Sequence, residues 1–259
     1  MLTMKTGKNI LKKMLDKLSG CVIGSAVLLS SFLLHSCNDD EGYPMGALAY
    51  DWVTVNVSNH TYSFTGDEWG TLYPAAGGLW VEPVDGQRAF LWFSLIGDNY
   101  GGYDHAIKPE AIRYFLTKGV EEITSVEDDK EYGDDPVCLE DLWISGGHLN
   151  VLFNQKLPVD GNKHRMSLVK NELAENPDDG YIHLEYRYNT YGDTLSNVVV
   201  PGVVCYNLST LNVDSVSKGI RLEVNDAVKG SRTITFDVEE QETFPAGMEE
   251  KDFTRCVIK

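Results

Sequence analysis

The best single candidate for acid–base chemistry is Tyr103-Asp104-His105, which follows two glycines. A neighbouring carboxylate can orient an imidazole, and histidine is the side chain most often used as a general base. The same spacing is typical of a turn in which the Asp104 carboxylate accepts hydrogen bonds from backbone N–H groups. We favour the turn and predict no catalytic residue, while keeping Tyr103, Asp104 and His105 as part of a ligand-binding surface.

Other patterns associated with catalysis or metal binding are missing from the sequence. The chain has no GxSxG nucleophile elbow, no HExxH zinc motif, no P-loop and no GxGxxG. His183 and Glu185 match the first half of a zinc-deaminase pattern, but no PCxxC follows. A cross-strand polar ladder that also contains Arg187 explains them better. We therefore predict no metal, no cofactor and no enzymatic activity.

Two tryptophans are candidates for a binding surface. Trp69 follows Asp67-Glu68 and precedes a glycine, and Trp80 precedes Glu82-Pro83, so both have the surroundings of loop residues. Exposed aromatic rings can stack on sugars or bury themselves in a partner. We predict that Trp69 and Trp80 contribute to a ligand or partner surface. The alternative is that each ring folds back on its own domain.

The N-terminal segment has the composition of a secretory signal. Residues 1–20 contain five lysines, and the uncharged run at 21–34 is shorter than the roughly 20 apolar residues that span a bilayer. Leu34-His35-Ser36-Cys37 resembles a bacterial lipobox, in which cleavage precedes the cysteine and the cysteine is acylated. We predict a lipoprotein signal peptide over 1–36 and a lipid anchor on Cys37. An ordinary signal peptide that leaves Cys37 free is the alternative.

The charge balance excludes one class of partner. The chain has 22 Lys and Arg against 39 Asp and Glu, a net charge of −17, and loss of 1–36 would remove five lysines and one aspartate to leave −21. Nucleic acid requires a basic face, so it is excluded as a partner.

The segment 38–41 (NDDE), directly behind Cys37, resembles the acidic surface-export signal of some outer-membrane lipoproteins. A solvated tether explains it equally well. We expect lipid anchoring in the bacterial cell envelope, at the outer membrane, with exposure on the cell surface if the export signal applies.

Most of the chain after residue 37 alternates with the period of a β-strand. Val53, Val55 and Val57 share one face of a predicted strand, and the run 89–96 (AFLWFSLI) is apolar on both faces, as a barrel strand would be. Asp-Gly and Lys-Gly turn signals separate such runs. Long helical periodicity is missing from this part of the sequence, which predicts an all-β protein.

An acidic stretch divides the chain. Residues 119–136 contain eight Asp and Glu, which favours a linker or exposed crossover. A calcium loop is the alternative, although the spacing does not match an EF-hand. The lengths on either side suit a small closed barrel and a β-sandwich. We predict a barrel over 37–118, an acidic linker over 119–136 and a β-sandwich over 137–259.

Three cysteines follow Cys37 in the sequence, namely Cys138, Cys205 and Cys256, and no CxxC is present. One disulfide could form in an oxidising compartment, but the sequence does not select the pair. Buried free thiols are the alternative.

The order of several short motifs resembles one known family. The motifs are 85–88 (DGQR), 102–105 (GYDH), 133–137 (GDDPV), 141–144 (DLWI), 178–181 (DDGY), 187–189 (RYN) and 191–193 (YGD). Together with the lipobox, they make the chain similar to the NigD-like lipoproteins. The resemblance implies an N-terminal OB-type barrel followed by an immunoglobulin-like β-sandwich. The family is named after a protein encoded beside a bacteriocin and proposed as its immunity factor, and it supplies no established catalytic residue.

Three functions follow as hypotheses. The first is a non-catalytic cell-envelope lipoprotein that binds a protein or glycan, since barrels of the OB type bind oligosaccharides. The second, which the family name suggests, is bacteriocin immunity, in which an acidic body captures a cationic peptide. The third is a hydrolase that acts on envelope polymers or polysaccharides, with His105 as the residue to test.

Overall fold

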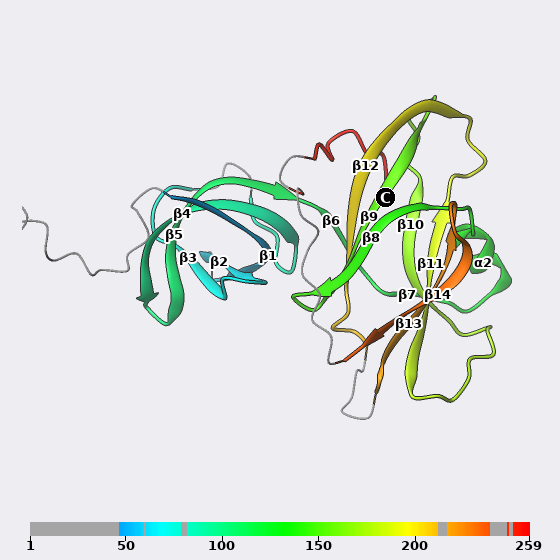
Figure 1. Ribbon diagram of the computed structural model, residues 1–259, viewed down its shortest axis with the longest axis horizontal. Helices are drawn as coiled ribbons and strands as arrows, with labels where there is room; N and C mark the ends of the chain where they lie inside the picture. The colour runs from blue at the N-terminus through cyan, green and yellow to red at the C-terminus, as the bar shows by residue number, and fades with distance from the viewer. Residues whose placement is uncertain (1–46, 60, 79–81, 212–216, 239–247, 249–250) are drawn as a thin grey trace, which may run out of the picture. The chain divides into compact units, whose positions relative to one another are not determined.

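The structure of the protein is a computed structural model that describes residues 47–59, 61–78, 82–211, 217–238, 248 and 251–259 (Figure 1). Almost all of the regular structure in these ranges is β-strand, which confirms the predicted all-β class. The helices formed by these residues are all too short or too polar to cross a membrane. The predicted signal peptide and Cys37 lie outside the described residues.

Five strands close an N-terminal barrel in the order β1-β2-β3-β5-β4. Their bounds are β1 (Leu48–Ser58), β2 (Thr61–Gly66), β3 (Thr71–Pro74), β4 (Arg88–Tyr100) and β5 (Tyr103–Tyr114). Strands β3 and β5 pair in parallel, and the other pairs are antiparallel. Successive side chains of a strand point to opposite faces, so Val53, Val55 and Leu91 all reach the barrel interior and are fully buried.

Two sheets form the C-terminal β-sandwich. One has five strands in the order β14-β13-β11-β10-β7, and the other has four in the order β6-β12-β9-β8. The bounds are β6 (Leu116–Gly119), β7 (Glu121–Ile123), β8 (Cys138–Ser145), β9 (His148–Pro158), β10 (Arg165–Asn171), β11 (Tyr181–Asn189), β12 (Leu195–Asn207), β13 (Gly219–Asp226) and β14 (Gly230–Asp237). The barrel followed by a sandwich is the predicted architecture.

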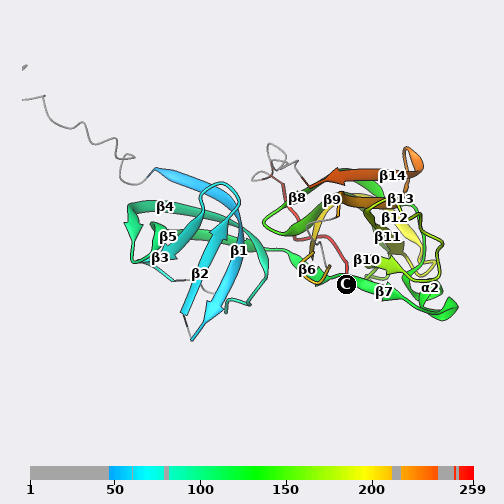
Figure 2. The same cartoon turned by 90° about the horizontal axis from the view of Figure 1, so that it is seen from below.

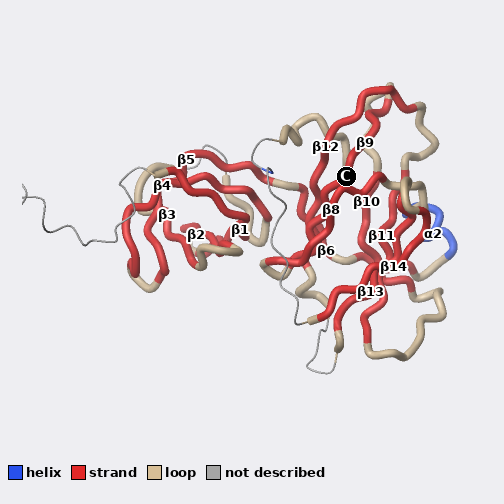
Figure 3. The backbone as a smooth tube through the Cα atoms, viewed as in Figure 1, coloured by secondary structure: helices blue, strands red, loops and turns tan. Residues whose placement is uncertain are grey.

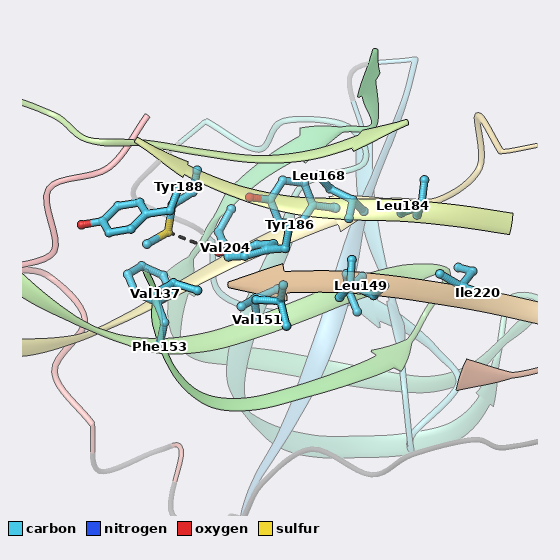
Figure 4. Packing of buried hydrophobic residues seen from close by; sticks show 14 of the residues in the cluster. Val137, Leu149, Val151, Phe153, Leu168, Leu184, Tyr186, Tyr188, Val204 and Ile220 are labelled. Carbon is cyan, nitrogen blue, oxygen red and sulfur yellow. Dashed lines mark hydrogen bonds between the residues drawn. The ribbon is translucent and has the colours of Figure 1, made fainter. Parts of the chain in front are cut away.

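The core of the sandwich lies between its two sheets (Figure 4). Leu168 and Leu184 come from the five-stranded sheet, and Val151 and Val204 come from the four-stranded sheet. Tyr186 is also buried there, and its hydroxyl donates to the Met166 sulfur at 3.3 Å. The hydrogen bond satisfies a polar atom that would otherwise be costly to bury.

The predicted boundary at 119–136 differs from the structure. Strand β6 already belongs to the sandwich, β7 pairs with β10, and α2 (Val126–Tyr132) packs beside β10 and β11 (Figure 3). The helix begins with a capping box between Ser125 and Asp128. The acidic stretch is therefore part of the sandwich domain, and the sandwich begins before residue 119.

Arginines from distant strands hold this acidic stretch in place. Arg187 on β11 donates to Asp129 at 3.0 Å, and Arg165 on β10 donates to Glu131 at 3.2 Å. These pairs lower the repulsion among the carboxylates, so a sequence that looks like a solvated linker can fold against a sheet.

Residues from the barrel and the sandwich meet in one aromatic cluster. The Trp52 ring stacks on Phe115 at 4.6 Å between centroids and contacts Trp143 edge-on at 5.2 Å. Beside them, the fully buried Arg88 forms a two-point ion pair with Asp67, at 2.5 and 3.0 Å. Arg88 also donates to the Ser145 hydroxyl at 3.3 Å, which connects β4 to the end of β8.

Candidate functional site

The hairpin of β4 and β5 carries most of the predicted site residues. Its turn is Gly101-Gly102, and both glycines have positive φ (59° and 95°), which glycine adopts without steric cost. Tyr100 and Tyr103 face each other across the turn, and Asp98 faces His105 two residues further along. The turn therefore pairs residues at equal distances on its two sides.

His105 pairs with Asp98, not with its neighbour Asp104. The His105 Nδ1 lies 2.6 Å from the Asp98 Oδ1, on the barrel surface, with the two side chains 22% and 55% exposed. Sequence reasoning missed Asp98, although its distance from the Gly101-Gly102 turn matches that of His105 and could have shown the pairing.

Asp104 is used to join two strands. Its Oδ2 accepts hydrogen bonds from the Thr71 backbone N–H at 2.8 Å and from the Thr71 hydroxyl at 2.6 Å, and the same hydroxyl accepts from the Asp104 N–H. These bonds hold the pKa of the Asp104 carboxyl below its usual value. The sequence placed Asp104 in the turn after Gly101-Gly102, but the backbone amide that it binds belongs to Thr71 on β3, and His105 has Asp98 as its partner instead.

Three tyrosines form an aromatic surface at the end of this hairpin. Tyr73 of β3 stacks on Tyr100 at 5.4 Å and 22°, and it contacts Tyr103 at 5.1 Å and 38°. Tyr100 is 51% exposed, and Tyr73 and Tyr103 are half-buried. We call Tyr73, Tyr100 and Tyr103 the tyrosine surface. Of the three, the sequence pointed only to Tyr103.

Trp69 folds back on its own barrel domain, which was the alternative to an exposed binding surface. Its ring meets Phe93 and His105 edge-on, each at 5.5 Å between centroids. It thereby supports the His105 side of the hairpin. Trp80 lies outside the described residues.

A buried carboxyl positions the loop that carries Trp69. Asp51 of β1 is fully buried and accepts hydrogen bonds from the backbone N–H groups of Glu68 (3.2 Å) and Trp69 (3.0 Å). Gly66 allows this approach, because a Cβ there would lie 2.1 Å from the Asp51 carboxylate. Burial raises the pKa of Asp51 to about 7. Asp51 was missed by sequence reasoning because its partners are backbone atoms of a loop.

The geometry supports ligand stacking better than chemistry at a reacting bond. Flat aromatic rings bordered by a histidine–carboxylate pair offer a face for apolar contact and polar groups for orientation. In the described part of the chain, no set of three or more His, Cys, Asp and Glu side chains is placed to hold a metal ion. Cys138, Cys205 and Cys256 are free thiols there, and burial raises the pKa of both Cys205 and Cys256 to about 12.

Comparison with known families gives two matches. Residues 52–113 match the NigD-like N-terminal OB domain, and residues 119–238 match the NigD-like C-terminal beta sandwich domain. The second match begins at residue 119, inside the stretch predicted as a linker. A search of curated proteins gave no match.

Several solved structures share this architecture. A protein of unknown function from Bacteroides vulgatus has 24% identity and a TM-score of 0.65, covering 80% of this chain and 95% of that one. A toxin-related protein from Parabacteroides distasonis has 26% identity and a TM-score of 0.60, covering 74% and 94%. A NigD-like immunity protein from Bacteroides caccae has 16% identity and a TM-score of 0.50, covering 76% and 100%.

Proposed function

The chain belongs to the NigD-like family, and from that premise we propose that it is a non-catalytic, lipid-anchored binding protein of the bacterial cell envelope. Its barrel would hold a glycan on the tyrosine surface. The main support for this proposal is the packing of the Tyr73, Tyr100 and Tyr103 rings at the end of the β4–β5 hairpin. Barrels of the OB type use the loop between strands 4 and 5 to bind oligosaccharides, and this hairpin turn is that loop.

The surroundings of the tyrosine surface suit a neutral, hydroxyl-rich ligand. The ring of Tyr100 offers an apolar face, while Asp98 and His105 can exchange hydrogen bonds with sugar hydroxyls. With a net charge of −17, the protein would repel an anionic polymer at long range. The same binding hypothesis also allows a protein partner, which would bury these tyrosine rings in its interface.

A glycan panel tests the proposal. The purified protein is probed against neutral and acidic oligosaccharides, together with the Tyr100→Ala variant. Tyr191→Ala is the matched control, because Tyr191 is another exposed tyrosine (41%) and lies in the sandwich. We expect binding of neutral glycans by the wild type and the control, and at least a tenfold loss in Tyr100→Ala. Equal binding by all three proteins would reject the tyrosine surface as the site.

The anchor is a separate part of the proposal and is supported by the motif at 34–37 and by the uncharged run before it. Mass spectrometry of the protein from its native membrane should find acyl chains on Cys37, and Cys37→Ala should release the body from the membrane. External protease applied to intact cells then distinguishes the cell surface from the periplasmic side. An unmodified Cys37 in the mature protein would contradict the anchor without affecting the glycan site.

Capture of a toxic peptide is the second candidate function. The net charge of −17 and the names of two structural neighbours, one toxin-related and one an immunity protein, favour it. An acidic body would bind a cationic peptide with an affinity that falls as salt rises. A deletion strain that keeps its normal sensitivity to neighbouring bacteriocins would argue against this function.

The hydrolase hypothesis has less support. His105 is hydrogen-bonded to Asp98, and among the described residues no serine, threonine or cysteine is bonded to His105, as the activated nucleophile of an esterase or peptidase would be. Loss of a polysaccharide-cleaving activity in His105→Ala would bring the hypothesis back.

A further inference from the structure

Strand β14 forms one edge of the five-stranded sheet, and this edge differs from the other three sheet edges of the sandwich. Strands β7 and β6, at two of those edges, have three and four residues. Strand β8 is interrupted by a register shift between Leu139 and Asp141 and carries two acidic residues there. Short strands, bulges and charges are the usual ways in which proteins prevent edge pairing.

Strand β14 is neither short nor interrupted by a bulge, and its two charged residues, Arg232 and Asp237, lie outside its central segment. Its eight residues, Gly230–Asp237, keep one register with β13 from end to end. The segment 233–236 (TITF) has strong β-propensity and includes no charge or proline. Figure 2 shows β14 (orange) at the margin of the sandwich domain. A strand of this kind is ready to pair with another chain.

The register between β13 and β14 shows which backbone groups of β14 are available to pair with another strand. The Val238 N–H donates to the Lys218 carbonyl, so even-numbered residues of β14 form the hydrogen bonds to β13. The N–H and C=O groups of Ser231, Thr233 and Thr235 therefore point away from β13. Within the described part of the chain, β14 pairs only with β13.

A groove of about 210 Å³ runs beside this edge, between β14 and β8. Its apolar lining comes from Leu139 and Leu142 on one side and from Ile234 and Phe236 on the other. Side chains of an added strand alternate in direction, so every second one would enter this groove. The edge thus offers both backbone pairing and apolar contacts for one face of an extended segment.

Charge selects between the possible occupants. Glu223, the register partner of Thr233, is exposed and has no ion pair among the described residues. In the groove wall, Asp141 and Lys229 both lack an ion pair among the described residues and offset each other, and Arg232 is already paired with Asp226, so Glu223 is the unbalanced charge beside the edge. A second copy of this chain would carry its own net charge of −17, whereas a basic segment would carry the opposite sign.

We propose that β14 binds an extended, basic segment of a partner protein as an added strand. The segment has apolar residues that alternate with lysine or arginine. Its backbone pairs with Ser231, Thr233 and Thr235, its apolar side chains enter the groove beside Ile234, and its basic side chains face Glu223. The surface is separate from the tyrosine surface and does not depend on glycan binding.

A synthetic heptapeptide of alternating lysine and valine, labelled with fluorescein, is the probe for the purified full chain. Fluorescence anisotropy compares it with a peptide in which glutamate replaces lysine. The test variant is Thr233→Pro, which removes an N–H that points away from β13 and so should spare the sheet. Thr233→Val is the matched control because it keeps that N–H. We expect the lysine peptide to bind, with a tenfold or greater loss in Thr233→Pro and little change in Thr233→Val.

Hydrogen exchange on the wild-type protein tests the same site without a variant. The amides of Thr233 and Thr235 should exchange more slowly when the lysine peptide is added. Protection elsewhere, or equal binding of the lysine and glutamate peptides, would overturn the proposal. So would a concentration-dependent dimer that Thr233→Pro abolishes, because a second copy would then be the occupant of the edge.

Discussion

Loss of one partner from the buried ion pair between Arg88 and Asp67 should destabilise the protein strongly. Arg88 is 0% exposed and the Asp67 side chain is 8% exposed, and two hydrogen bonds join them. Asp67→Asn removes the negative charge that balances the guanidinium buried against Trp52, which leaves it only neutral acceptors: the new amide oxygen and the Thr54 and Ser145 hydroxyls. Removal of one partner of such a pair costs about 3–5 kcal/mol.

Thermal unfolding measures this effect. For a chain of this size each kcal/mol corresponds to roughly 2–4 °C, so Asp67→Asn should lower the midpoint by roughly 10 °C. Glu110→Gln is the control, because it breaks the exposed pair with Lys108 and should change the midpoint little. The double variant Asp67→Leu with Arg88→Met should recover much of the loss, since it leaves no unpaired charge. A loss of less than about 1 kcal/mol in Asp67→Asn would show that the Arg88 charge does not need Asp67 to remain buried.

Two further predictions concern the same part of the chain. Burial raises the pKa of Asp51 to about 7, so the folded protein binds this proton more tightly than the unfolded chain, and stability should fall as pH rises from about 4 to 7. Urea unfolding at several pH values should show that the free energy of unfolding of Asp51→Asn does not fall in this way between pH 4 and 7. An identical pH dependence in the wild type and Asp51→Asn would contradict the prediction. Gly146→Ala should destabilise the protein by about 2 kcal/mol or more, because Gly146 has a φ of 54° and a Cβ there would lie 2.5 Å from the Asp67 Oδ1. Gly147→Ala, with positive φ but open space around it, should cost less, and equal losses would show that contact with Asp67 is unimportant.

The sequence predicted the class of fold because alternation is a local property. Val53 and Val55 are inward on β1, and the two-sided apolar run 89–96 lies within the barrel strand β4. The boundary near residue 119 was misplaced for a different reason. The acids of α2 look solvated along the sequence, but Arg165 and Arg187, which pair with them, come from distant strands.

The candidate site shows the same division between local and distant information. The turn at Gly101-Gly102 could be derived from neighbouring residues. Tyr73 could not, because β3 meets β5 in parallel and joins residues about 30 positions apart. Parallel pairs have no tight turn to mark their register, so sequence spacing does not reveal them.

Calorimetric titration of the tightest-binding glycan from the panel tests whether the tyrosine surface binds a glycan without cleaving it. Wild-type protein, Tyr100→Ala and His105→Ala are titrated, and the glycan is recovered afterwards and analysed for cleavage. We expect binding by the wild type, at least tenfold weaker binding by Tyr100→Ala, and intact glycan in every sample. Unchanged affinity in Tyr100→Ala, or cleavage products that disappear in His105→Ala, would contradict this expectation.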